Sequence, residues 1–290
     1  RTARLPMNDV FVTATDEAVT PIRLVRTESL EEFLASLGDA ERRWAERGVF
    51  KAKPGQAVWL PDASGAPGRV AVGWDGRDSL ATLGGLPLSL AEGVYQVEGD
   101  VTELQLLGWA TGAYQFERYR TAERQPARLM LPAEHDGTRL ANLAAATTLI
   151  RDLINTPAQD MLPSHLAAEA DQLAQVQKAE CTITEGEELL DRSLFAIHAV
   201  GRAATDAPRL IDIRWGDESH PEVVLIGKGV CFDSGGLDLK PASAMRTMKK
   251  DMGGAAQVLG LAQLVMSQRL PVRLRVLIPA VENAVAGNAF

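Results

Sequence analysis

The feature that most constrains this chain is the alternation of short apolar stretches with amphipathic ones through its second half. Apolar runs predict strands at 210–215, 223–226 and 274–278, and helical periodicity over about 255–268 separates the last two. Strands and helices in this order favour a mixed, mostly parallel sheet with helices on both faces. Ligands of such sheets bind at the carboxyl ends of the strands, so a functional site is expected there.

Further helices and strands are predicted before these. A linking helix is expected at 138–155, because apolar positions recur at helical spacing and Pro157 ends the pattern. The same reading predicts a helix at 166–176, a strand at 181–184 and a helix at 187–196.

The first part of the chain has the pattern of a small α/β domain. An amphipathic helix is predicted at 29–47, begun by a capping box of Ser29 and Glu32. Strands separated by Gly, Pro and Asp turns are predicted at 22–25, 57–60, 69–72 and 103–107.

Residues 121–137 show little periodicity, and the boundary between two domains is placed there. We therefore expect an N-terminal α/β domain at 1–130, a linker with the linking helix at 131–157, and the first half of a catalytic domain at 158–290.

Composition excludes several classes of partner. The 30 basic and 38 acidic residues give a net charge of −8, which repels a phosphate backbone, so no nucleic-acid partner is expected. Apolar runs stay well short of the roughly 20 residues that a membrane span needs. Cys181 and Cys231 lie far apart and outside any CxxC spacing, so neither a zinc finger nor a disulfide framework is indicated, and a cytoplasmic location fits best.

One segment concentrates charged residues among glycines. It runs over 227–240, directly after the predicted strand 223–226, and continues at 248–256. Glycines let the backbone turn sharply and approach a ligand closely. Its charged residues of interest are Lys228, Asp233, Lys240 and Asp251, whose intervals do not place them on one helix, so the loop must fold back to bring them together.

Familiar nucleotide and nucleophile motifs do not fit this segment. Gly227-Lys228-Gly229 lacks the P-loop spacing, and no GxGxxG follows a predicted strand. Ser234 lies in a sequence similar to that around a serine-protease nucleophile, but no suitable His and Asp precede it. No histidine has the spacing of a paired metal ligand; the four are His135, His165, His198 and His220.

Two readings of the four charged residues remain open. Asp233 and Asp251 are suited to divalent cations, which carboxylates bridge at roughly 3.5–4 Å separation. Near such cations Lys228 would lose its proton and coordinate as a neutral amine, while Lys240 would stay charged and stabilise an oxyanion. Alternatively, the same residues form two lysine–carboxylate ion pairs on a surface loop.

The segment resembles the signature of the leucyl aminopeptidase family, the M17 metallo-aminopeptidases, written GKGxxFDSGGxxxKP followed by MKxDMxGAA. The match to this signature, at the family spacing, covers residues 227–229, 232–236, 240–241 and 248–256. Cys231 stands where Thr is common. Residues 153–161 are similar to the family's NTPANDM element and residues 279–283 to its PAVEN turn. The resemblance covers about 138–290.

This resemblance implies a site with two divalent metal ions, Mn or Zn. Lys228, Asp233 and Asp251 would be metal ligands, with Asp233 bridging both ions. Lys240 would be the catalytic residue that faces the substrate carbonyl, and Met248 would line the pocket for the first side chain. Met248 as an ordinary core residue is the alternative.

The implied activity is hydrolysis of the N-terminal residue, apolar and leucine-like, from peptides with a free N-terminus. A metal-activated water would attack the peptide carbonyl, and the full-length parent would assemble as a homo-hexamer.

One family element is missing from the sequence. The NTDAEGR element, which supplies further Asp and Glu ligands and an Arg, is expected after residue 290, and no Asp-x-Glu-x-Arg replaces it. We therefore expect a C-terminally truncated chain that is inactive or incomplete by itself. The competing hypothesis is a non-catalytic structural or regulatory member of the family.

Overall fold

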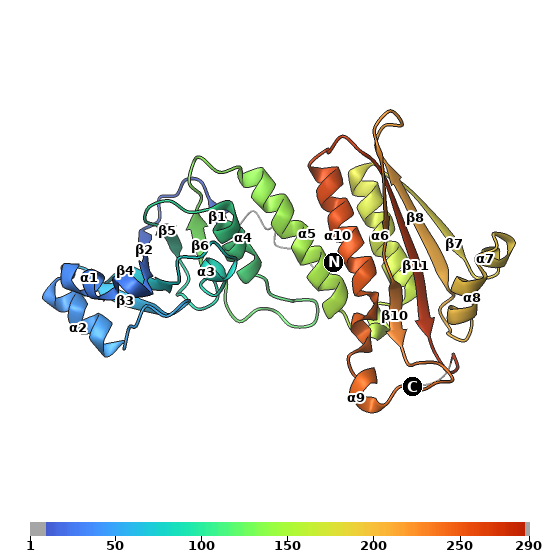
Figure 1. Cartoon of the computed structure of the whole chain (residues 1–290), viewed down its shortest axis with the longest axis horizontal. Coiled ribbons are helices and arrows are strands. Elements are labelled where there is room, and N and C mark those ends of the chain that lie inside the picture. Colours follow the sequence, from blue (N-terminus) through green and yellow to red (C-terminus); the bar gives the residue numbers. More distant parts are fainter. Residues whose placement is uncertain (1–9, 288–290) are drawn as a thin grey trace. The chain divides into compact units, whose positions relative to one another are not determined.

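The computed structural model describes residues 10–287, and the chain divides into two compact units between Ala144 and Ala145. Each unit has its own sheet (Figure 1) and its own buried apolar residues. The division falls inside one long helix, and the predicted domain limits at 130 and 157 stay predictions. Within residues 10–287, no helix has both the length and the apolarity needed to cross a membrane.

The first unit is built on a six-stranded sheet with the order β1-β6-β5-β2-β4-β3. Every neighbouring pair is parallel except β3 with β4. Its strands are β1 (Phe11–Val12), β2 (Val19–Arg26), β3 (Ala57–Pro61), β4 (Pro67–Trp74), β5 (Val94–Val97) and β6 (Arg128–Met130). Its helices are η2 (Thr27–Ser29), α1 (Leu30–Ser36), α2 (Asp39–Arg47), α3 (Ala81–Gly84) and α4 (Glu103–Gly112).

Alternate side chains of this sheet enter two different cores. On β4, Val70 and Val72 pack into a cluster with Trp109 of α4, whereas Ala71 packs with Phe33 of α1. This period of two follows from the pleat of a strand, and it places helices on both faces. The predicted small α/β domain is confirmed.

The strand predicted at 103–107 is wrong, because these residues begin helix α4. Thr102 Oγ1 accepts a hydrogen bond from the Gln105 backbone N–H at 3.2 Å, and Gln105 Oε1 accepts one from the Thr102 N–H at 3.1 Å. This reciprocal cap satisfies two backbone donors that a helix start otherwise leaves unpaired. The short apolar run alone does not distinguish a strand from a buried helix.

The single helix predicted at 29–47 is instead two helices. Leu37 has an extended backbone and Gly38 separates α1 from α2. Ser29 makes no side-chain cap, and the start of α2 is held by Glu41, whose Oε2 accepts a hydrogen bond from the Gly38 N–H at 3.2 Å. Burial of Leu37 in the core favours this break over helix continuity.

Two other predictions need correction. The connection predicted at 121–137 contains strand β6, which pairs with β1 and β5. The helix predicted at 187–196 is two short helices, because Ser193 between them adopts a left-handed backbone conformation.

The second unit has a mixed sheet centred on β11, and the predicted mixed α/β class is confirmed. β11 is parallel to β9 and β10 and antiparallel to β8, which pairs with β7. Its strands are β7 (Glu180–Glu185), β8 (Arg209–Trp215), β9 (Glu222–Ile226), β10 (Gly229–Asp233) and β11 (Arg273–Asn283). Its helical segments are η3 (Ala158–Asp160), α6 (Pro163–Gln177), α7 (Glu188–Asp191), α8 (Phe195–Gly201), α9 (Ala242–Met245), η4 (Met248–Met252) and α10 (Gly253–Ser267), with α5 (Gly137–Asn155) shared between the units.

Helices α6 and α10 cover one face of this sheet (Figure 1). The core between them contains Ile211 and Ile213 of β8 and Val276 and Ile278 of β11. β9 and β10 pair with successive parts of the same side of β11, so Gly227 and Lys228 lie in a short break within one strand line. That break is where the charged segment begins.

Candidate active site

The four charged residues predicted to act together form two ion pairs. Lys228 Nζ lies 2.9 Å from Asp251 Oδ1 and 2.8 Å from its Oδ2, which joins the start of β10 to η4. Lys240 Nζ lies 3.0 Å from Asp233 Oδ2, which closes the loop that follows β10. Because β10 and η4 pack against each other, both pairs belong to one region of the second unit.

Lys228 is held where the β9–β10 break meets the start of α10. The backbone oxygen of Lys228 accepts a hydrogen bond from the Ala255 N–H at 2.9 Å. A Cβ atom on Gly254 would lie 2.8 Å from the Lys228 nitrogen, and one on Gly227 would lie 2.7 Å from the Gly254 oxygen. The glycines are therefore needed for the close approach of two backbones.

We expect Gly254→Ala to lower the free energy of unfolding by about 2 kcal/mol, because the added methyl group meets a backbone that no side-chain rotation can move. Gly253→Ala is the matched control, since its Cβ would meet only Ile154 Cδ1 at 3.8 Å. The control should be neutral or stabilising by up to about 1 kcal/mol, as expected for alanine in a helix. Urea unfolding measures the free energy of unfolding of both variants. An equal loss in the two would contradict the claim that Gly254 is needed for the close approach of the two backbones.

Asp233 is positioned by an irregularity in its strand. β10 pairs with β11 in register up to Val230, and one extra residue before Phe232 shifts the pairing, so that Asp233 lies opposite Asn283. A bulge of this kind redirects the side chains that follow it. Asn283 Nδ2 donates a hydrogen bond to Asp233 Oδ1 at 2.8 Å.

The turn after Asp233 returns the chain to the same carboxylate. The Gly235 N–H donates to Asp233 Oδ1 at 2.9 Å, and the Lys240 N–H donates to the Ser234 oxygen at 2.9 Å. Gly235 and Gly236 have φ of +94° and +65°, conformations that side chains other than glycine rarely adopt. Two glycines thus allow Lys240 to reach Asp233.

The pKa of Asp233 lies below its ordinary value. Burial alone raises the pKa of this carboxyl, but hydrogen bonds from Lys240, Gly235 and Asn283, together with the positive charge of Lys240, outweigh burial. The Asp233 carboxylate is therefore ionised at neutral pH. It carries the negative charge that a residue needs to bind a metal cation.

Asp251 is the more deeply buried of the two candidate carboxylate ligands, with 13% of its side chain exposed. Its Oδ2 is buried and, among residues 10–287, accepts no hydrogen bond, although the Lys228 ammonium group lies beside it. The Lys228 ammonium group, 2.8 Å away, compensates the charge of this buried oxygen, and it is the partner that a divalent cation would replace.

These donors fit part of a divalent-cation shell. Two carboxylates and an amine are a reasonable set of oxygen and nitrogen ligands for Mn²⁺ or Zn²⁺. Lys228 is 58% exposed, so its side chain is free to change partners. Among residues 10–287, however, no three His, Cys, Asp or Glu side chains are grouped to hold a metal ion. A complete shell needs ligands beyond these.

Met248 begins η4, three residues before Asp251, and is only partly buried. It lies outside the core, which takes Met252 from the same segment instead. The next residue, Lys249, donates from Nζ to the Asn155 oxygen at 2.9 Å and so links η4 to the end of α5. Met248 is placed on the same segment as Asp251, and its role stays a prediction.

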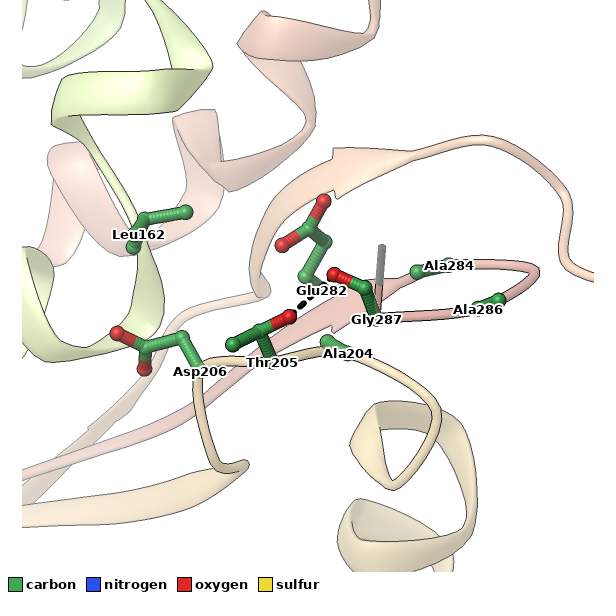
Figure 2. A pocket seen from close by; sticks show the side chains of 8 residues that line it. All are labelled: Leu162, Ala204, Thr205, Asp206, Glu282, Ala284, Ala286 and Gly287. Carbon is green, nitrogen blue, oxygen red and sulfur yellow. Dashed lines mark hydrogen bonds between the residues drawn. The ribbon is translucent and has the colours of Figure 1, made fainter. Parts of the chain in front are cut away.

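A second acidic pair, which the sequence analysis did not identify, lines a pocket of about 300 Å³ (Figure 2). Asp206 and Glu282 are among the residues that line this pocket, and the pKa of Glu282 is raised by burial and by the negative charge of Asp206. Glu282 lies in the 279–283 element that the sequence analysis singled out, but nothing in the sequence pairs it with Asp206.

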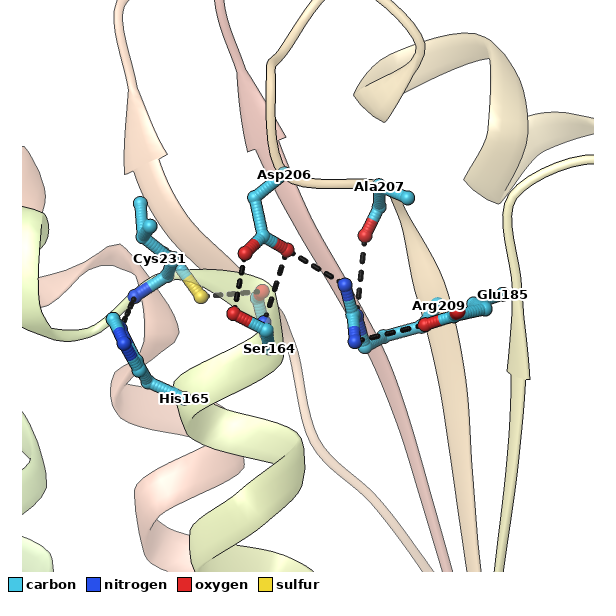
Figure 3. Close-up of polar contacts among 9 residues, drawn as sticks. Ser164, His165, Glu185, Asp206, Ala207, Arg209 and Cys231 are labelled. Atoms are coloured by element: carbon cyan, nitrogen blue, oxygen red, sulfur yellow. Dashed lines mark hydrogen bonds and ion pairs between the residues drawn. The ribbon is translucent and has the colours of Figure 1, made fainter.

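Asp206 is held by a polar network at the start of α6 (Figure 3). It accepts hydrogen bonds from the Ser164 N–H at 3.1 Å and from the Ser164 hydroxyl, and Arg209 Nη2 donates to it at 2.7 Å. Arg209 also pairs with Glu185 at 3.0 Å and donates from Nε to the Ala207 oxygen at 3.1 Å. This network fixes the loop before β8.

Comparison with known proteins gives matches over both units. The family model "M17 aminopeptidase, N-terminal domain" matches residues 20–132, and "Cytosol aminopeptidase family, catalytic domain" matches residues 148–290. A probable cytosol aminopeptidase of Wolinella succinogenes is 31% identical over 267 residues, which is 83% of this chain and 55% of that protein.

Solved structures of similar proteins match the chain over both units. The cytosol aminopeptidase of Coxiella burnetii is 41% identical with a TM-score of 0.89, covering 97% of this chain and 62% of that one. The bottromycin maturation enzyme BotP in complex with Mn is 28% identical with a TM-score of 0.75, covering 94% of this chain and 61% of that one. The chain thus spans about half to three fifths of the length of these similar proteins.

Proposed function

Because the chain belongs to the cytosol aminopeptidase family, M17, we propose that it contributes to metal-dependent removal of N-terminal residues from peptides. Lys228, Asp233 and Asp251 are the residues that would hold two divalent ions, and Lys240 is the proposed catalytic residue. The observation that carries this proposal is that β10, the loop after it and η4 bring two carboxylates, Asp233 and Asp251, and their two lysines into one region of the second unit.

The chain's own residues have distinct parts in this chemistry. Divalent ions, when bound, polarise the scissile carbonyl and lower the pKa of a bound water. Asp233 and Asp251 would supply the negative charge that holds them, and Lys228 would release its ammonium proton to solvent and bind as a neutral amine. Lys240, 30% exposed and 3.0 Å from Asp233, keeps a positive charge close to where the oxyanion develops.

The proposed function extends to the substrate, the metal ion, the assembly and the location of the protein. Met248, partly exposed and three residues before Asp251 on η4, is assigned to the pocket for an apolar, leucine-like first side chain. Mn²⁺ is one expected ion, supported by the Mn complex of BotP, and Zn²⁺ is the other. The name of the Wolinella relative supports a cytoplasmic location, and a homo-hexamer is the proposed assembly.

Titration of the purified chain with Mn²⁺ by calorimetry tests the metal ligands. We expect measurable but weak binding, because only two carboxylates are grouped, and Asp251→Asn should weaken it by at least about tenfold. Asp238→Asn makes the same change of charge at an exposed position of the nearby loop and should leave the affinity unchanged. Equal affinities for the two variants would exclude Asp251 as a ligand.

Hydrolysis of a leucine chromogenic amide, with Mn²⁺ and after chelation, tests the activity itself. Chelator-sensitive hydrolysis supports the aminopeptidase proposal for these 290 residues. A folded chain that binds Mn²⁺ without hydrolysis instead supports the non-catalytic alternative.

A further inference from the structure

We propose that Asn283 is a positioning residue that sets the orientation of the Asp233 carboxylate. This inference rests on the proposed function and adds a residue to its metal site. The two residues lie 50 positions apart in the chain, yet the strand pairing places them directly opposite each other at the ends of β10 and β11.

The orientation of the Asn283 carboxamide follows from chemistry. An ionised carboxylate only accepts hydrogen bonds, so the amide nitrogen of Asn283 must be the atom that faces Asp233 Oδ1. The carboxamide oxygen then points to Gly236, where a Cβ atom would lie 2.8 Å from it. The glycine leaves room for one end of the carboxamide while the other end binds Asp233.

Asn283 also holds the turn that follows Asp233. Its backbone oxygen accepts hydrogen bonds from the Ser234 N–H at 3.0 Å and from the Ser234 hydroxyl at 2.7 Å. One residue therefore binds both the Asp233 side chain and the backbone immediately after it. Together these contacts restrict rotation of the carboxylate about its own bonds.

The two oxygens of Asp233 are left unequal. Oδ1 accepts from two fixed donors, Asn283 Nδ2 and the Gly235 N–H. Within the described residues 10–287, the partner of Oδ2 is the partly exposed Lys240 ammonium group. Oδ2 is thus the oxygen that can exchange its partner for a cation. Groups that orient a ligand in this way typically change metal affinity by 10–100-fold when removed.

Calorimetric titration of Asn283→Ala with Mn²⁺ tests the proposal. We expect the dissociation constant to rise about tenfold or more. Ser234→Ala is the matched control. It removes the hydrogen bond from the Ser234 hydroxyl to the Asn283 backbone oxygen and the one that this hydroxyl accepts from the Gly236 N–H, but it keeps the hydrogen bond from Asn283 Nδ2 to Asp233, so its effect should be much smaller. In the Asp233→Asn background, Asn283→Ala should have no further effect, since there is no carboxylate left to orient. Urea unfolding establishes that each variant is folded.

The outcomes separate this inference from the proposed function. If the unmutated chain binds Mn²⁺ and Asn283→Ala binds equally well, Asn283 does not position the ligand, while the metal site stands. If Ser234→Ala weakens binding as much as Asn283→Ala, the turn and not the carboxamide is responsible, and the proposal is wrong. If the unmutated chain binds no Mn²⁺, the proposed function fails and this inference fails with it.

Discussion

Arg209→Met should lower the free energy of unfolding of the second unit by about 3–5 kcal/mol, the usual loss when one partner of a buried ion pair is removed. The Arg209 side chain is only 10% exposed, and Asp206, which it contacts at 2.7 Å, is 15% exposed (Figure 3). Without the guanidinium, the partner that Asp206 keeps within residues 10–287 is Ser164, and the negative charge of Glu282, which lines the same pocket, stays nearby. The second ion pair, to Glu185, is more exposed and contributes less.

Arg214→Met on the same strand is the control. Arg214 is 57% exposed, and its partner Asp212 keeps two hydrogen bonds from Arg275, so a loss of at most about 1 kcal/mol is expected. Urea unfolding followed by circular dichroism gives both values. Adding Asp206→Asn to Arg209→Met should restore part of the stability, because it removes the uncompensated charge; a further loss would show that charge burial is not the cause.

The position of the candidate site was predictable from the sequence, but its pairings were not. Glycines among charged residues after a predicted strand identified the segment that carries Lys228, Asp233, Lys240 and Asp251. Their spacing did not determine which lysine faces which carboxylate. That choice depends on η4 packing beside β10 and on the two left-handed glycines of the loop, which are tertiary features.

For a related reason, the sequence did not predict the contacts of Asn283, Asp206 and Glu282. Asn283 reaches Asp233 through parallel strand pairing and a bulge, and neither has a local signature in the chain. Asp206 meets Glu282 across 76 positions, as the difference of their numbers shows, in a pocket formed by separate loops. Local patterns report on helices, strands and turns, whereas such contacts follow only from the assembled sheet.

The strand predicted at 210–215 agrees with β8 to within one residue. The strand predicted at 274–278 is only the first part of β11, which continues to Asn283 through residues 279–283, the segment expected to be a turn. Prediction failed at Glu103–Gly112, where a short apolar run is compatible with a strand or a buried helix. The decisive local signal was the capping box of Thr102 and Gln105, which lies at the edge of that run. For this segment, the residues that cap the start of the helix therefore indicate the secondary structure better than the apolar pattern does.

Gly112→Ala should destabilise the first unit by about 3 kcal/mol, the upper end of the usual range for overpacking. A Cβ atom at Gly112 would lie 1.9 Å from the Gly84 oxygen, and one at Gly108 would lie 2.2 Å from the Leu80 oxygen. Both clashes are with backbone atoms of the α3 region, so relief requires the two helices to separate. Separation would also expose Trp109, which is fully buried on α4.

Gly85→Ala is the control for this prediction, because a Cβ atom there would meet nothing within 4 Å and its backbone conformation suits alanine. We expect its free energy of unfolding to stay within about 0.5 kcal/mol of the unmutated chain. Alanine at position 112 gains up to about 1 kcal/mol of helix propensity, which opposes the clash. A net loss larger than that of the control would therefore come from helix contact alone. Equal stability of the two variants would mean that α3 and α4 can separate without cost, which contradicts the close glycine packing.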